Sequence, residues 1–285
     1  MLQLQELLQQ RQEIFYTPKR GFLRIFGKDC QSFVQRMSTG DIGELSPKKP
    51  VGTCFITNKG KMVDFAVVFL WAADDIILVS SAPDNQHLYQ WLSNFHFAED
   101  LTFDGAFSGQ CHIRVSPKVH ELENAVFLGD FLYHGVHWLV SFVYGTAPGP
   151  SIHDDAWQTL RIMALLPEFP QEIHEHYMPD TINLEGFVAD NKGCYIGQEV
   201  ISKARLYQKH KKSLLGIQVS QDDWAKLKPQ AMVLGPCKEA CLVVSVAPFY
   251  LPDGVHALVV TDGKRADENT AFLGTVQAFV TKSLK

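Results

Sequence analysis

A cysteine flanked by two glycines is the residue of this sequence best placed to do chemistry. Cys194 lies in the segment 191–200, between Gly193 and Gly197 and two residues after Lys192. Glycine adopts a positive φ easily and allows close approach, so Gly193 can take a positive φ and Gly197 can admit a backbone or a flat ligand. A neighbouring ammonium group favours a thiolate, which predicts a lowered pKa for the Cys194 thiol. The alternative is a tight turn in which the thiol packs as a small apolar group.

The glycine-flanked cysteine leads into a helix, predicted from the spacing of Val200, Ile201 and Ala204. A loop that enters a helix directs unpaired N–H groups at its neighbours. Gln198 and Glu199 lie in the first turn and are candidate hydrogen-bonding groups. Together these residues predict a reactive or ligand-contacting thiol at a helix start.

Residues 192–199, Lys-Gly-Cys-Tyr-Ile-Gly-Gln-Glu, resemble the signature of the YgfZ family. These are folate-binding proteins related to the aminomethyltransferase (T-protein) of the glycine cleavage system. The resemblance covers nearly the whole chain but is diffuse outside these eight positions. It implies a tetrahydrofolate, or a one-carbon derivative of it, bound close to a catalytic Cys194. The signature residues that it places around the cofactor are Lys192, Gly193, Tyr195, Gly197, Gln198 and Glu199.

Asp64 is a candidate for the pterin end of the site. It ends the run 58–64, Asn-Lys-Gly-Lys-Met-Val-Asp, which resembles the glycine-then-aspartate hairpin of the aminomethyltransferases. In that family the aspartate lies beside the reactive nitrogens of the folate. An acid on the inner face of an apolar strand is costly unless it meets a partner. The alternative is a solvent-facing aspartate in an alternating strand.

Arg161 is the second candidate. It lies in Leu-Arg-Ile-Met-Ala-Leu, residues 160–165, where the relatives carry Leu-Arg-Ile-Glu-Ala-Gly and the glutamate holds the pterin. Here Met163 replaces that glutamate, and a thioether is only a weak acceptor. Folate affinity is therefore expected to be weaker, or Glu168 or Glu185 is expected to substitute. Arg161 as a cation on the helix surface is the alternative.

A basic run follows the signature helix. It contains no acidic residue, and its cations suit a polyglutamate tail, a phosphate or RNA, with a solvated face as the alternative. RNA platforms add exposed aromatic residues, and only Tyr195 and Tyr207 lie close, so no direct nucleic-acid binding is expected. We include Arg205 among the cofactor-binding candidates. The basic residues of the run are Lys203, Arg205, Lys209, His210, Lys211 and Lys212.

Composition describes an ordinary globular chain of 285 residues, 46% hydrophobic and 20% charged, with a net charge of −5. No apolar run approaches the roughly 20 residues of a membrane span, and no signal peptide is recognisable, so no membrane association is expected. Six cysteines without a C-x-x-C suit a reducing, cytoplasmic compartment. Cys237 and Cys241, and likewise His174 and His176, lack further ligands in the sequence, so no metal site is predicted.

Short strands and amphipathic helices alternate without a repeating βαβ order. Helices are predicted over 2–15, 29–40, 83–97 and 154–166, each by its apolar spacing. A hairpin joins strands 51–57 and 61–71, and five or six short strands follow residue 213. The pattern favours an α+β fold with a mixed or antiparallel sheet, ending in a small β-barrel. The resemblance adds two ferredoxin-like sheet and helix subdomains around a central folate site, giving a folate-binding region at 1–212 and a barrel at 213–285.

Three interpretations of the function remain open from the sequence. The resemblance implies a folate-binding protein that assists iron–sulfur cluster assembly or repair in client proteins, including enzymes that modify tRNA. There Cys194 would act as a redox-active thiol, a transient cluster ligand or a one-carbon relay. The alternative is a folate-dependent aminomethyltransferase or related one-carbon transferase, supported by Asp64. A silent scaffold that has lost folate is a third possibility, which Met163 keeps open.

Overall fold

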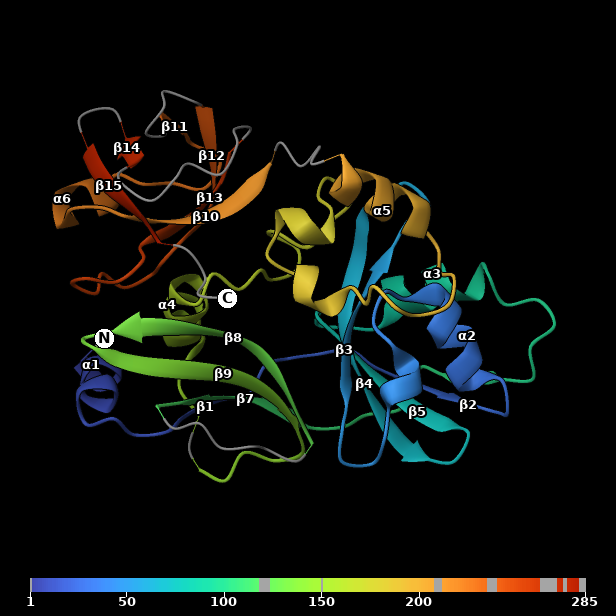
Figure 1. The fold of residues 1–285 in the computed structure, drawn as a ribbon. Helices are drawn as coiled ribbons and strands as arrows, with labels where there is room; N and C mark the ends of the chain where they lie inside the picture. The colour runs from blue at the N-terminus through green and yellow to red at the C-terminus, as the bar shows by residue number, and fades with distance from the viewer. Residues whose placement is uncertain are drawn as a thin grey trace.

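The computed structural model describes residues 2–117, 124–149, 151–207, 212–234, 240–261, 271–273 and 276–281. Within these residues the paired strands form three antiparallel sheets (Figure 1). The outcome agrees with the predicted α+β class and with antiparallel rather than doubly wound pairing. Two of the sheets face one another, and the third follows them in the chain.

The five-stranded sheet has the strand order β3-β4-β5-β2-β6. Its central strands are apolar on both faces, because helices cover one face and a second sheet covers the other. Helices α2 (Cys30–Met37) and α3 (Gln86–Ser93) bury Phe33, Val34, Leu88 and Leu92 against it. Its strands are β2 (Phe22–Phe26), β3 (Val51–Ile56), β4 (Met62–Ala72), β5 (Asp75–Ser80) and β6 (Thr102–Asp104).

The four-stranded sheet has the order β1-β7-β9-β8 and turns its inner face to the five-stranded sheet. Phe69 of β4 and Phe142 of β9 meet between them, with ring centroids 6.2 Å apart. Helices α1 (Leu2–Gln9) and α4 (Asp154–Met163) pack with the same core. The strands are β1 (Ile14–Tyr16), β7 (Cys111–Ser116), β8 (Ala125–Tyr133) and β9 (Val136–Tyr144).

The segment from the end of α4 to residue 197 runs between the sheets, in yellow in Figure 1. It contains only short 3-10 turns, η2 (Pro179–Thr181) and η3 (Glu185–Phe187), before α5 (Gln198–Leu206) begins. Its apolar residues Ile173, Ile182 and Leu184 are buried in the core shared by the two sheets. This irregular segment therefore forms part of the lining between them.

The third sheet has the order β11-β12-β13-β10-β15-β14. Among the residues that the structure describes, no hydrogen-bonded pairing joins β11 to β14, so the predicted closed barrel is not shown. A short helix, α6 (Gln221–Trp224), follows the first strand. The strands are β10 (Ser213–Gln218), β11 (Met232–Leu234), β12 (Ala240–Val246), β13 (Ala257–Thr261), β14 (Ala271–Leu273) and β15 (Val276–Thr281).

All four predicted helices are shorter in the structure, those predicted over 2–15 and 83–97 the most. The helix predicted over 2–15 ends at Gln9, because residues 14–16 instead form β1 and pair with β7. The helix predicted over 83–97 spans Gln86–Ser93. Asp29 does precede α2, as predicted, but its carboxylate accepts from the Asp100 amide at 2.8 Å rather than from the helix. A division between residues 212 and 213 remains a prediction.

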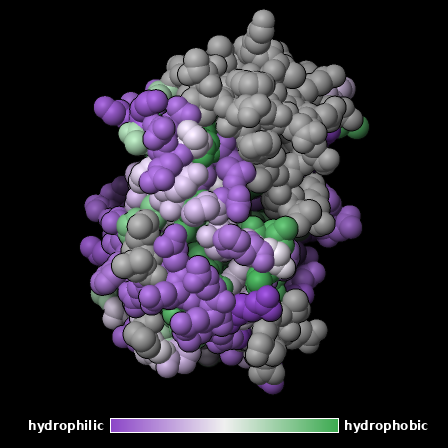
Figure 2. Space-filling view, turned by 90° about the vertical axis from the view of Figure 1, so that its left-hand side faces the viewer, coloured by the Kyte–Doolittle hydropathy of each residue, from purple (hydrophilic) through white to green (hydrophobic). Residues whose placement is uncertain are grey.

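The surface shown in Figure 2 is mostly hydrophilic. Hydrophobic residues gather there only in small patches among the residues that the structure describes. Within the described ranges, no helix is both long and apolar enough to cross a bilayer.

Candidate functional site

A cavity lies between the two facing sheets. Its volume is about 50 Å³, enough for a few water molecules. Apolar side chains of both sheets form most of its wall, and polar groups gather on one side. The lining residues are Arg20, Phe65, Val67, Val79, Ser80, Ser81, Ile113, Leu128, Phe142, Trp157, Arg161, Leu166, Pro167, Glu168, Ile173, Leu184 and Phe187.

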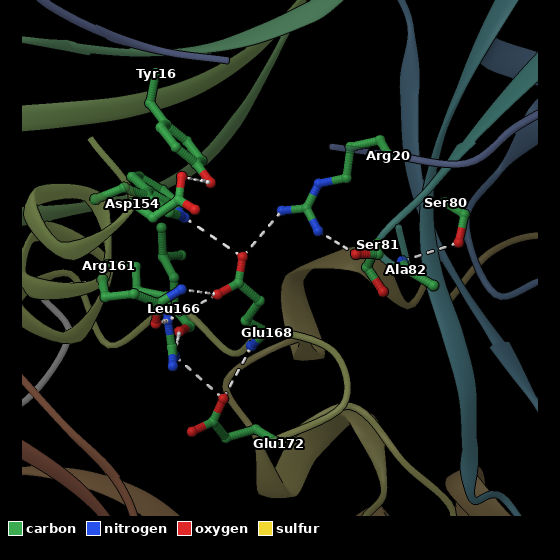
Figure 3. Close-up of polar contacts among 12 residues, drawn as sticks. Tyr16, Arg20, Ser80, Ser81, Ala82, Asp154, Arg161, Leu166, Glu168 and Glu172 are labelled. Atoms are coloured by element: carbon green, nitrogen blue, oxygen red, sulfur yellow. Dashed lines mark hydrogen bonds and ion pairs between the residues drawn. The ribbon is translucent and has the colours of Figure 1, made fainter. Parts of the chain in front are cut away.

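Glu168 is the centre of the polar side (Figure 3). Its Oε1 accepts from Arg20 Nη2 and from Trp157 Nε1, both at 3.4 Å. Its Oε2 accepts from the Gln158 amide and faces Arg161 Nε at 3.1 Å. Arg20 also donates to the Ser81 carbonyl, and so it joins Glu168 to the end of β5. The carboxylate is thus held by groups from α4 and from the connection between β1 and β2.

Arg161 is buried, so its interpretation as a cation on the helix surface is wrong. The side chain is only 2% exposed. Nη1 donates to the Leu166 carbonyl and to Glu172 Oε2, each at 3.1 Å. Nη2 donates to Ser245 Oγ of β12 at 2.9 Å. Arg161 therefore lines the cavity and also ties α4 to the third sheet.

Met163, at the position where the relatives carry a glutamate, is buried but is not among the cavity-lining residues. Its sulfur lies near Gly254, in the connection between β12 and β13. Of the two proposed substitutes, Glu168 lines the cavity and Glu185 lines a neighbouring cleft. A carboxylate is therefore present in the cavity, five residues after the expected position.

Asp64 is fully buried and does meet partners, so its interpretation as a solvent-facing residue is wrong. Its oxygens accept from the hydroxyls of Ser80 and Ser81, both at 2.5 Å, and from the Phe65 amide at 2.8 Å. His87 Nε2 lies 3.6 Å from Oδ2. Burial raises the pKa of Asp64, although His87 and the two serines act in the opposite direction. Asp64 reaches the cavity through Ser80 and Ser81, which line it.

An open cleft of about 710 Å³ adjoins the cavity, and Leu128 and Phe187 line both. Arg205 lies in this cleft, where Nε donates to Asp180 Oδ1 and Nη1 donates to Asp190 Oδ1, each at 2.8 Å. Desolvation opposes the charge of Arg205, but these carboxylates outweigh it and raise its pKa. The cleft is lined by Phe127, Leu128, Asp180, Asn183, Glu185, Gly186, Phe187, Asp190 and Arg205.

Cys194 is exposed and lies in a different place. It lines a shallow groove beside α2, with Phe33, Met37 and Phe95, and this groove shares no lining residue with the cavity. Lys192 turns away toward the end of α2, where Nζ donates to the carbonyls of Ser38 at 2.8 Å and Gly40 at 2.5 Å. Burial lowers the pKa of Lys192 to about 8. The expected juxtaposition of this thiol with the central cavity is therefore not seen.

The remaining signature residues are mainly structural in their contacts. Gly193 does not adopt a positive φ. Gly197 does, with φ +81°, and a Cβ there would lie 2.6 Å from the Thr57 carbonyl, so the backbone approaches closely at Gly197. Tyr195 is buried, and the Lys192 ammonium lies 5.4 Å from its ring centroid. Gln198 begins α5, and Glu199 forms an exposed ion pair with Lys203. Of the basic run, Lys209, His210 and Lys211 lie outside the described residues.

Several residues of the site are not signalled by any motif. Arg20, Trp157, Ser81 and His87 come from separate elements, and only the packing of the two sheets brings them together. Glu168 directly follows Pro167, after an amphipathic helix, and the sequence suggests it only as a substitute for the glutamate missing at Met163. Within the described residues no group of three or more His, Cys, Asp or Glu side chains is arranged to hold a metal ion.

The comparisons with known proteins point to aminomethyltransferases. The glycine cleavage system aminomethyltransferase T from Bartonella henselae has the same fold, with a TM-score of 0.73 at 14% identity, over 99% of this chain and 88% of that one. No family model matches the chain. In sequence, the chain is 23% identical to the aminomethyltransferase of Alkaliphilus oremlandii over 232 residues, 67% of this chain and 63% of that protein.

A chloroplastic protein of Arabidopsis thaliana named as a transferase is likewise 23% identical, over 237 residues, 70% of this chain and 54% of that protein. The chain thus aligns with between half and two thirds of the length of these relatives. These findings confirm the aminomethyltransferase side of the sequence resemblance. They give no support to its finer assignment to the YgfZ family, or to iron–sulfur clusters and tRNA modification.

Proposed function

We propose that this chain binds a reduced folate between its two facing sheets and acts as a folate-dependent one-carbon transferase of the aminomethyltransferase type. The observation that supports this most is the Glu168 carboxylate, on the polar side of a largely apolar cavity in a fold shared with an aminomethyltransferase. The similarity to aminomethyltransferases supports the transferase interpretation, whereas the iron–sulfur interpretation depends on the Cys194 thiol, which lies in a separate groove.

The donor and acceptor groups of the cavity suit a pterin. A pterin presents N–H groups along one edge and needs a flat apolar slot around its rings. Both contacts of Glu168 Oε1 are 3.4 Å long, at the weak end of hydrogen bonding, so a ligand N–H can replace them at little cost. Phe65 and Phe142 supply apolar walls. When bound, tetrahydrofolate would supply the nitrogen that accepts the one-carbon unit.

The enclosed volume of about 50 Å³ is below the roughly 300 Å³ of a small-molecule pocket. The adjoining cleft of about 710 Å³ is within that range. Because Leu128 and Phe187 line both spaces, a movement of these two side chains would join them. We propose that folate enters from the cleft, with its pterin toward Glu168 and its remainder along the side where Arg205 lies.

Several finer features belong to the same proposal. In this proposal, residues 213–285 form a barrel that contains the sheet of strands β10 to β15. The two facing sheets are ferredoxin-like, and residues 1–212 form the folate-binding region. Arg205 contributes positive charge near the glutamate tail only in part, because Asp180 and Asp190 already share its guanidinium. Lys203, which is exposed on the same helix, is the second candidate for that tail.

Titration with tetrahydrofolate, followed by tryptophan fluorescence, tests the binding step. Trp157 lines the cavity and donates to Glu168, so its emission should change on binding, and Trp157→Phe should lose that signal. Glu168→Gln removes the anionic acceptor and should weaken binding about tenfold or more. Glu175→Gln, at an exposed glutamate in the same segment, is the matched control.

The transfer step needs a separate assay. Purified protein, an aminomethylated carrier protein and tetrahydrofolate should give methylene-tetrahydrofolate and ammonia, and Glu168→Gln should slow this product formation. Absence of any fluorescence change up to millimolar tetrahydrofolate would rule out the proposed function. Binding without product would retain a folate-binding protein and reject the transferase.

A further inference from the structure

A half-buried histidine stands behind the polar side of the cavity and is not used by the proposed function. His87, in the first turn of α3, stacks on Phe169 with ring centroids 5.0 Å apart and an interplanar angle of 26°. Its Nε2 is buried, has no hydrogen-bond partner among the described residues, and lies 3.6 Å from Asp64 Oδ2. An imidazole edge aimed at a fully buried carboxylate calls for an explanation.

The charge of Asp64 decides what the cavity wall offers to a ligand. While Asp64 is ionised, its carboxylate can only accept hydrogen bonds. Ser80 and Ser81 therefore both donate their hydroxyl hydrogens to it. Ser80 Oγ is further occupied by the Ala82 amide at 3.0 Å, whereas Ser81 Oγ keeps lone pairs for the cavity. The wall then accepts hydrogen bonds. Once Asp64 is protonated, its O–H must donate to a serine oxygen, and a serine hydrogen is released to point into the cavity.

We infer that His87 is a positioning residue that keeps Asp64 ionised and thereby makes the Ser81 wall an acceptor for the N–H groups of a reduced pterin. When it carries a proton, an imidazole at 3.6 Å favours the carboxylate over the carboxylic acid. A tetrahydropterin carries N–H groups at positions 5 and 8, whereas an oxidised pterin has bare ring nitrogens there. The inference rests on the proposed function and adds selection for the reduced cofactor.

The other charged groups around this pair are compatible with that role. Arg20 donates to the Ser81 carbonyl, and Glu168 is the chain neighbour of Phe169, on which His87 stacks. Arg20 and Glu168 face one another at 3.4 Å and largely offset each other. Of these groups, His87 is the one whose side chain lies directly against the Asp64 carboxylate.

Carbon-13 NMR of protein labelled at its aspartate carboxyl groups tests the inference without folate. The Asp64 resonance is assigned with Asp64→Asn, and its titration is followed in the wild type, His87→Phe and His87→Gln. Phenylalanine keeps a ring on Phe169 but no charge, and glutamine keeps polarity but no charge. Both should raise the titration midpoint of Asp64 by about one pH unit or more. His134→Asn, in the exposed β8–β9 turn, should leave it unchanged.

The affinity ratio of tetrahydrofolate to folic acid provides the second readout. His87→Phe should lower this ratio several-fold at neutral pH, and the ratio should recover above the raised midpoint, where Asp64 ionises without help. An unchanged Asp64 midpoint overturns the role of His87. A shifted midpoint with an unchanged ratio overturns the selection for reduced pterin. If neither folate binds, the proposed function fails, while the NMR titration still decides whether His87 controls Asp64.

Discussion

Gly193 and Gly197 flank the same cysteine, yet only one of them needs to be glycine. Gly197 combines φ +81° with a carbonyl oxygen 2.6 Å from its would-be Cβ, and this oxygen belongs to Thr57 at the end of β3. A Cβ on Gly193 would meet nothing within 4 Å. The spacing of the two glycines was visible in the sequence, but the φ value and the neighbour that separate their roles come from the packing of the loop on β3.

Alanine substitutions at the two glycines should therefore differ sharply. We expect Gly197→Ala to lower the free energy of unfolding by about 1–3 kcal/mol, because it adds both a strained φ and a backbone clash. Gly193→Ala should change it by less than about 0.5 kcal/mol. Urea unfolding followed by circular dichroism measures both, and equal losses would contradict this account of the loop.

Lys192, in the same loop, makes the stability of the protein depend on pH. Burial lowers its pKa from the ordinary 10.5 to about 8. Between these values the unfolded chain retains a proton that the folded chain has released, so this group makes the protein more stable as the pH rises from about 8 to 10.5. Below about pH 8 the lysine is charged in both states and the cost of its burial is present in full.

Lys192→Met should remove that pH dependence. The difference in unfolding free energy between the variant and the wild type should favour the variant most near pH 7 and should shrink toward pH 10.5. Urea unfolding across this range gives the difference curve, in which the titration of other groups cancels. A difference that is flat with pH would mean that the lysine titrates normally in the folded protein.

At the scale of elements, α4 and the loop after it connect all three sheets. Arg161 donates to Ser245 of β12 and to Glu172, and Ser245 Oγ in turn donates to Glu172 Oε1 at 2.5 Å. Glu172 is fully buried. Removing one partner of a buried ion pair leaves the other charge uncompensated, which costs about 3–5 kcal/mol.

A double-mutant cycle measures this connection. Arg161→Met alone should be strongly destabilising, because Glu172 keeps its charge without a counter-ion. Arg161→Met combined with Glu172→Gln should lose at least about 1 kcal/mol less than the sum of the two single variants. Thermal unfolding of the four proteins gives the coupling energy, and strict additivity would argue against a shared network.

The elements show what local pattern can and cannot predict. The predicted hairpin strands 51–57 and 61–71 agree with β3 and β4 to within one residue, because their apolar runs and the turn between them are local signals. Strand β1 was missed, because three residues pair with β7 about a hundred positions later and their sequence equally suits a helix. The cavity itself follows from such distant pairing. Asp64 and Arg161 were predicted to matter, but their partners Ser81, His87 and Ser245 could not be read from spacing.

At the scale of the whole molecule, Leu128 and Phe187 line both the cavity and the open cleft. Phe187 packs across Gly52 and meets Phe65 edge to face, with centroids 4.8 Å apart. Phe187→Ala should join the two spaces and speed the association of tetrahydrofolate. Loss of the aromatic ring should also lower the free energy of unfolding. The expected loss is only about 1–3 kcal/mol, because Phe187 is partly rather than fully buried.

Phe127→Ala is the matched control for that variant. Phe127 lines the cleft but not the cavity and is 53% exposed, so association rates and stability should stay close to those of the wild type. Stopped-flow fluorescence with tetrahydrofolate gives the rates. An association rate that Phe187→Ala leaves unchanged would show that folate does not pass this pair of side chains.

The chain crosses between the two facing sheets more than once, and this sets an order of events during synthesis. Residues 14–16 belong to a sheet whose other strands come from 111–144, while the strands of the intervening sheet lie between residues 22 and 104. During synthesis, strand β1 therefore leaves the ribosome long before its partner strand β7 has been made. The cavity between the sheets can form only after both sheets are complete. Ligand binding should therefore be among the last properties that the nascent chain acquires.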